Sequence, residues 1–121
     1  MANTFKLKTQ ANVTNEAISH ADALVYTVPA STHTVVLGIS LANITSGSIT
    51  ADVRVVSDTS DTETNSDTYL GKSLPVPAGG TLEIMQGNKL VLEDTDALRI
   101  RASASSSIDA LISIMEITCL S

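Results

Sequence analysis

Apolar and polar residues alternate along most of this chain. In the run "HTVVLGISLANI" (33–44), larger apolar residues recur at every second position, with mostly small residues between them. Successive side chains of a β-strand point to opposite faces, so a period of two predicts a half-buried strand. The residues predicted to point inward are Val35, Leu37, Ile39 and Leu41.

The run "ITADVRVVS" (49–57) follows after a short connection that contains Ser and Gly. It also alternates, and we expect Asp52 and Arg54 to point outward. Two alternating runs joined by a tight polar turn are typical of a β-hairpin. The pattern therefore predicts that 33–44 and 49–57 pair with each other.

Further strand-like runs occupy residues 4–9, 23–28, 68–76, 81–85, 89–93, 98–104 and 108–117. The tripeptide "QGN" (86–88) predicts a second hairpin, between the two runs that flank it. Alternation turns Arg99 and Arg101 outward, whereas the mixture of Ile, Leu and Met in 108–117 predicts burial on both faces of that strand. Segment 10–22 has weak periodicity and is expected to hold a turn or a short strand.

About eight short strands with regular turn signals, and no convincing helix, favour an all-β fold. We expect a single antiparallel β-sandwich, of jelly-roll or immunoglobulin-like type, with no major helix. The 121 residues are enough for one domain. Residues 23–121 would form the sandwich, and residues 1–22 would form either an N-terminal arm or an edge strand.

The core must be largely aliphatic, because aromatic residues make up only 2% of a chain that is 43% hydrophobic. The aromatic residues are Phe5, Tyr26 and Tyr69. Proteins that bind carbohydrate or single-stranded nucleic acid usually stack their ligands on aromatic side chains. The composition therefore disfavours both functions.

The formal net charge is −6, and the seven basic residues are scattered. Nucleic-acid binding relies on Lys and Arg to neutralise phosphates, so we expect no nucleic-acid partner. Neither a signal peptide nor a long apolar run is evident, which predicts synthesis in a cytoplasm and no membrane association. The lone Cys119 excludes a disulfide within the chain.

Four acidic residues and no base lie in the stretch "SDTSDTETNSDT" (57–68). Calcium requires several convergent oxygen ligands, yet the spacing fits no calcium-loop pattern and the stretch has no Gly for a sharp turn. We therefore expect no metal site here. The stretch is interpreted either as a solvated connection or as a loop that contacts a partner.

No catalytic signature stands out. None of the Ser residues lies in G-x-S-x-G, and His20 and His33 are too few for zinc, which needs three or four convergent ligands. Residue type leaves open that Glu83, Glu93 and Asp96 converge as the carboxylates of a glycoside hydrolase. We expect a non-enzymatic protein without cofactor or metal.

The run at 74–118 combines a "VPAG" turn, a "KLVLE" hairpin that leads to a Ser- and Ala-rich turn, and a closing "DALISIMEI" strand. With the earlier run at 25–55, it resembles small β-sandwich structural proteins of tailed-bacteriophage virions. The resemblance implies a virion component, and we favour a capsid decoration (cement) protein that stabilises the particle through contacts with neighbouring subunits. The alternatives are a neck, tail or fibre-attachment component, or a host-surface module that binds glycans.

Such a protein would be located in the virion and would form homo-oligomers. Its partners would be other virion proteins, either the major capsid protein or neck and tail subunits. The candidate partner contacts are Phe5, Lys6, Lys8, Asp58, Asp61, Glu63 and Asp67.

Chelation should leave the stability of the protein unchanged, because the sequence offers no set of metal ligands. We expect the melting temperature in excess EDTA to equal that in buffer alone, as measured by differential scanning calorimetry. A large fall on chelation would identify the acidic stretch as a ligand set.

Overall fold

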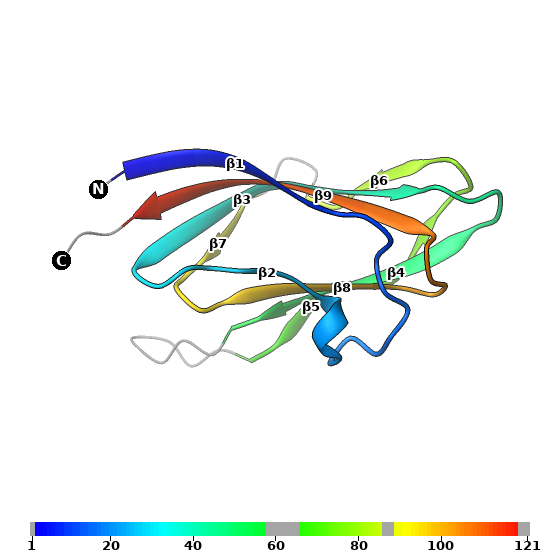
Figure 1. Cartoon of the computed structure of the whole chain (residues 1–121), viewed down its shortest axis with the longest axis horizontal. Helices are drawn as coiled ribbons and strands as arrows, with labels where there is room; N and C mark the ends of the chain where they lie inside the picture. The colour runs from blue at the N-terminus through cyan, green and yellow to red at the C-terminus, as the bar shows by residue number, and fades with distance from the viewer. Residues whose placement is uncertain (1, 58–65, 86–88, 119–121) are drawn as a thin grey trace.

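A computed structural model describes residues 2–57, 66–85 and 89–118 of the chain. The candidate contacts Asp58, Asp61 and Glu63, the "QGN" turn and Cys119 lie outside these residues. Two antiparallel sheets pack face to face, which confirms the predicted β-sandwich (Figure 1). Within the described residues, no helix has the length and apolarity needed to cross a bilayer.

Each sheet is built from strands that are far apart in sequence. The first sheet contains β1 (Ala2–Gln10), β9 (Ile108–Thr118), β3 (Thr32–Asn43) and the short strands β6 (Thr81–Glu83) and β7 (Leu90–Leu92), which both pair with β3. The second sheet contains, in order, β2 (Leu24–Thr27), β8 (Ala97–Ala102), β4 (Ile49–Val56) and β5 (Thr68–Val76). A single 3₁₀ turn, η1 (Ala21–Ala23), precedes β2.

The pairing is nested from the chain ends inward. β1 pairs with β9, β2 with β8, β3 with β6 and β7, and β4 with β5. Because β6 and β7 lie along the same strand in the same direction, they act as one interrupted strand. When β6 and β7 are counted as one strand, and the strands are renumbered from one to eight along the chain, the two four-stranded sheets have the orders 1-8-3-6 and 2-7-4-5. These orders are those of the jelly roll.

Both predicted hairpins are wrong. β3 and β4 belong to opposite sheets, and the chain crosses between the layers at residues 44–48. β6 and β7 pair with β3 rather than with each other. A short polar turn signals that the chain changes direction, but it does not determine whether the next strand joins the same sheet or the opposite one.

Alternation predicted the inner faces of β4 and β8 correctly. Ala51 and Val53 in β4, and Leu98 and Ile100 in β8, are almost fully buried. In β9 the expected burial on both faces is wrong, since buried and more exposed residues alternate along the strand. The core therefore lies between the sheets and is aliphatic, with Tyr26 as its aromatic member.

A β-bulge in β3 reverses the predicted facing of its first half. The register with β9 shifts between Val36 and Gly38, so Val36 is buried while Val35 and Leu37 are only partly covered. Beyond the bulge, the prediction holds for Ile39. A bulge adds one residue to one strand only, which the sequence period does not reveal.

Asn43 holds the corner where the chain leaves the first sheet. Its buried amide nitrogen donates to the carbonyls of Gly47 and Val76 at 2.8 and 2.9 Å. Its amide oxygen accepts from the backbone N–H and the hydroxyl of Thr45 at 2.9 and 2.7 Å. One side chain thus ties the end of β3, the crossing turn and the end of β5 together.

Replacing Asn43 with Ala should destabilise the protein, because buried donors and acceptors lose their partners. We expect the free energy of unfolding, measured by urea denaturation, to fall by about 2 kcal/mol or more. The exposed Asn15 provides the matched control, and Asn15→Ala should change it by less than about 0.5 kcal/mol. Equal effects of the two substitutions would contradict this role for Asn43.

Candidate interaction surfaces

The outer face of the first sheet carries a row of apolar side chains that crosses it from one edge to the other. Phe5 of β1 pairs with Met115 of β9, Met115 with Val35 of β3, and Val35 with Val91 of β7. Phe5 and Val91, at the two ends, are 73% and 66% exposed. We call Phe5, Met115, Val35 and Val91 the apolar row.

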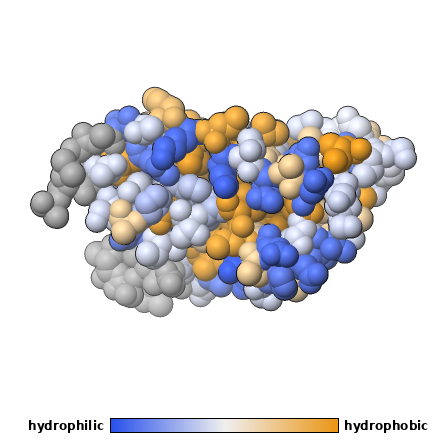
Figure 2. Space-filling model, in the orientation of Figure 1, coloured by the Kyte–Doolittle hydropathy of each residue, from blue (hydrophilic) through white to orange (hydrophobic). Residues whose placement is uncertain are grey.

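Leu7 and Leu111 extend the apolar surface next to this row. Both lie on the same face of the sheet, and both are exposed. Figure 2 shows hydrophobic residues along the upper rim of the molecule, over the sheet that contains β1 and β9. Covering one exposed Phe, Leu or Val side chain completely is worth about 1.5–3 kcal/mol. Contiguous exposed apolar surfaces are typical of interaction sites.

The opposite side of β1 is polar. Lys6 and Lys8 line a cleft of about 330 Å³ between β1 and β2, at one lateral edge of the sandwich. Edge strands commonly carry charged residues that point inward, and these hinder pairing with the edge of another sheet. The three candidate contacts of this segment therefore serve two surfaces, with Phe5 on the outer face and the two lysines at the lateral edge.

A buried polar network connects the two sheets beside this cleft. The Lys6 ammonium lies 2.8 Å from the carboxylate of Glu116, a residue that is only 8% exposed. The Tyr26 hydroxyl donates to the same carboxylate at 2.6 Å and lies 2.8 Å from the Thr34 hydroxyl. Because Tyr26 belongs to β2 and the other three residues belong to β1, β9 and β3, the network holds four strands together.

The network shifts the protonation equilibria of its members. The hydrogen bond from Lys6, and then the one from Tyr26, lower the pKa of the Glu116 carboxyl. Burial, and then the hydrogen bond to Glu116, raise the pKa of Tyr26 to about 12. Near neutral pH, Glu116 is therefore a carboxylate and Tyr26 a neutral donor.

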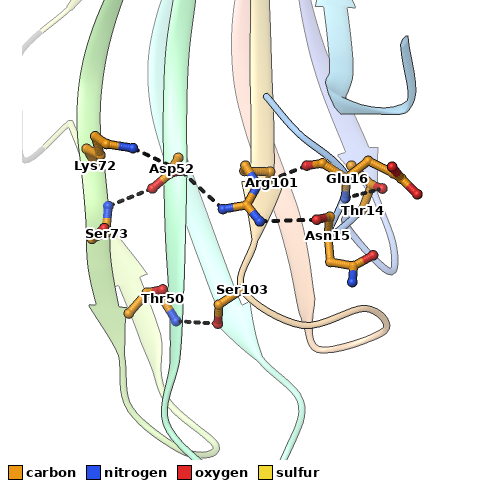
Figure 3. A network of polar contacts seen from close by, with 9 residues as sticks. All are labelled: Thr14, Asn15, Glu16, Thr50, Asp52, Lys72, Ser73, Arg101 and Ser103. Atoms are coloured by element: carbon orange, nitrogen blue, oxygen red, sulfur yellow. Dashed lines mark hydrogen bonds and ion pairs between the residues drawn. The ribbon is translucent and has the colours of Figure 1, made fainter. Parts of the chain in front are cut away.

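The outer face of the second sheet is charged. Asp52 of β4 is 5% exposed and accepts a hydrogen bond from Arg101 of β8 at 3.3 Å (Figure 3). Lys72 lies 3.9 Å from the same carboxylate, and the Ser73 N–H donates to it at 2.6 Å. Asp52 points outward, as expected, and side chains from both neighbouring strands cover it.

The outward arginines of β8 anchor the connection between β1 and β2. Arg101 donates to the carbonyls of Asn15 and Glu16 at 3.1 and 2.9 Å (Figure 3). Arg99 donates to the carbonyl of His20 at 2.8 Å. This connection lacks strand structure, and the two guanidinium groups supply its backbone with hydrogen-bond donors instead.

Asp67 is the one acidic candidate contact that the structure describes. Its carboxylate lies 3.6 Å from the guanidinium of Arg54. The same guanidinium and the ammonium of Lys72 lie over the ring of Tyr69, at 5.4 and 5.1 Å from its centroid. Asp67 therefore belongs to the charged face, away from Phe5 and the apolar row.

Of the three carboxylates that the sequence left open as a catalytic set, Glu93 and Asp96 line one cleft, whereas Glu83 does not. Glu83 accepts from the backbone N–H of Ile39 at the β3 bulge and from the Ser40 hydroxyl, at 3.2 and 2.6 Å. Asp96 accepts from the N–H of Glu93 at 3.1 Å within the turn that precedes β8. In the described part of the chain, no group of three or more His, Cys, Asp or Glu residues could hold a metal ion.

A second cleft opens at the other lateral edge, between β5 and β7. It has a volume of about 460 Å³, and Val55, Leu70, Leu90 and Leu92 supply much of its apolar lining. Sequence reasoning found neither this cleft nor the apolar row. Leu111, Ser113 and Met115 occupy alternate positions of β9. This pattern indicated an exposed outer face only weakly, because both faces of β9 are largely apolar.

The buried network should make stability depend on pH at both extremes. Glu116 has a lowered pKa in the folded state, so its contribution is present above the unfolded pKa and is lost as pH falls through the folded pKa. Tyr26 has a raised pKa, so its contribution is present below the ordinary value near 10.0 and is lost as pH rises through about 12. We expect the contribution of this network to stability to be greatest between about pH 5 and pH 10.

Urea denaturation at pH 7 and pH 3 tests the predicted loss of stability at acidic pH. Glu116→Gln should reduce the loss of unfolding free energy between these two pH values, because the carboxylate responsible is gone. Glu16→Gln, at an exposed carboxylate, should leave the loss unchanged. An identical pH dependence for wild type and Glu116→Gln would refute the role of the network.

Comparison of the chain with models of known protein families, with curated proteins and with solved structures gave no match. Functional inference therefore rests on the two outer faces, one apolar and one charged, and on the sequence resemblance.

Proposed function

We propose that this protein is a non-enzymatic structural component of a tailed-phage virion. Its role is that of a capsid decoration protein, which stabilises the particle by contacting neighbouring subunits. Those subunits are further copies of the chain and the major capsid protein. The proposal combines the sequence resemblance with one structural observation, the exposed apolar row.

The apolar row supports an assembly role because it is continuous and uncharged. It reaches from Phe5 at one edge of the sheet to Val91 at the other, and no ionisable side chain interrupts it. Stable interfaces take about 800 Å² from each partner and exclude charge from their centre. A sheet face with an uncharged apolar centre meets the second requirement, whereas the lysines of β1 oppose association through the sheet edge.

The fold is compatible with this role. Jelly rolls form many viral capsid domains, although they also form lectins and cupins. The fold alone therefore does not indicate the function, and the proposal depends on the exposed apolar surface. A glycan-binding role is less well supported, because Tyr26 is buried and Tyr69 lies beneath two cationic groups.

Polar substitutions in the apolar row should weaken self-association. We expect the double variant Phe5→Thr with Val91→Thr to raise the dissociation constant at least about tenfold in sedimentation equilibrium, because two apolar anchors are lost. Thr is itself β-branched, a shape that suits a strand. Ile44→Thr, at an exposed apolar residue beyond the end of β3, is the control and should associate like wild type. A monomeric wild-type chain, or unaltered association of the double variant, would contradict the proposed surface.

Cryo-electron microscopy of purified particles that encode the chain tests the location. Density at lattice positions on the shell is expected for a decoration protein. A single ring at one vertex would instead indicate a neck or tail component, and absence from the particle would overturn the virion assignment.

A further inference from the structure

Two arginines face each other directly across the middle of the second sheet. Arg54 of β4 and Arg99 of β8 are register partners, so their side chains emerge side by side on the outer face. Like charges at directly opposite positions destabilise an antiparallel pair. In the neighbouring pair, Asp52 stands opposite Arg101 and neutralises it. The Arg54–Arg99 pair has no such partner within its own two strands.

Arg99 does not bind a carboxylate in the contacts that the described residues provide. Its Nη1 donates to two backbone carbonyls, those of His20 at 2.8 Å and Ile18 at 3.4 Å. Carbonyls are neutral acceptors, so they orient the guanidinium and leave its charge in place. Arg99 is thus held in position by neutral acceptors, and no carboxylate among the described residues forms an ion pair with it.

Arg54 is only partly neutralised. Its nearest carboxylate, on Asp67, lies 3.6 Å away, which is longer than a charge-assisted hydrogen bond. The Nε atom of Arg54 is buried and has no hydrogen-bond partner among the described residues. A buried donor left without an acceptor is costly, and in native proteins such an atom calls for an explanation.

A small cleft lies at this pair. It has a volume of about 150 Å³ and is lined by Ser19, Arg54, Val56, Asp67 and Arg99. That is roughly the space of five water molecules. The lining offers two guanidinium groups and one hydroxyl as donors, against one carboxylate at 39% side-chain exposure.

We propose that this cleft binds a phosphate- or sulfate-type oxyanion between Arg54 and Arg99. Planar guanidinium groups donate paired hydrogen bonds that match the oxygens of such a group. The anion separates the two like charges and accepts hydrogen bonds from the guanidinium groups that line the cleft. Asp67 competes for the same guanidinium, so binding displaces its loose ion pair. The site lies on the opposite sheet from the apolar row and does not depend on the proposed virion role.

The test is an NMR titration of the full chain that follows the Nε–Hε signals of the arginines. Sodium phosphate is added at constant ionic strength, with sodium chloride as the reference salt. We expect saturable shifts of Arg54 and Arg99 with millimolar affinity, and smaller shifts of Arg101. A parallel titration with O-phosphoserine distinguishes the sources, since tighter binding of the monoester indicates a phosphoryl group on a larger molecule and equal or weaker binding indicates the free ion.

Substitutions should move the affinity in opposite directions. Arg54→Gln and Arg99→Gln should each weaken phosphate binding at least about tenfold, because a charge-assisted pair is lost. Asp67→Asn should strengthen binding several-fold while leaving both arginines intact, and it keeps the proposal testable if an arginine variant fails to fold. Lys89→Gln removes an exposed positive charge elsewhere and serves as the control. Shifts that do not saturate, or an Asp67→Asn variant that binds no better than wild type, would overturn the site.

Discussion

The pairing of β9 between β1 and β3 is the constraint on which the rest of the structure depends. β9 is the last strand in the described chain, and it pairs with nine residues of β1 and with most of the length of β3. The pairs between β1 and β9 join segments near the two ends of the described chain, so they form at a large separation in sequence. The remaining strands pair in nested order, which gives the jelly roll.

The same pairing creates both the apolar surface and the buried network. Because side chains alternate along β9, Met115 and Leu111 face outward while Glu116 faces the space between the sheets. Glu116 is tolerated there because Lys6 and Tyr26 both reach its carboxylate. A buried carboxylate without these partners would cost several kcal/mol, in the range of about 3–5 kcal/mol for a broken buried pair. The register that builds the apolar row is therefore also selected by the polar residues beneath it.

Charge is divided between the two outer faces. Four of the seven basic residues, Arg54, Lys72, Arg99 and Arg101, lie on the second sheet, where carboxylates and backbone carbonyls bind them. The apolar row on the first sheet has no charged member. A protein with a net charge of −6 repels its own copies, and an uncharged face is where close approach costs least. The charged face is instead organised around hydrogen bonds that fix the long connection before β2.

The sequence by itself determined where the strands lie and, in β4 and β8, which residues point inward. It could do so because the period of two is a local property of a strand and needs no knowledge of its neighbours. It did not determine the pairing, since backbone hydrogen bonds are the same for every residue, and the hairpins predicted after 33–44 and around 86–88 were both wrong. Nor did the sequence distinguish the outward-facing Phe5 and Met115 from the apolar residues of the core. Tertiary structure alone decided that these side chains face solvent, and it brought Arg54 opposite Arg99, because both outcomes require a register between strands that are distant in sequence.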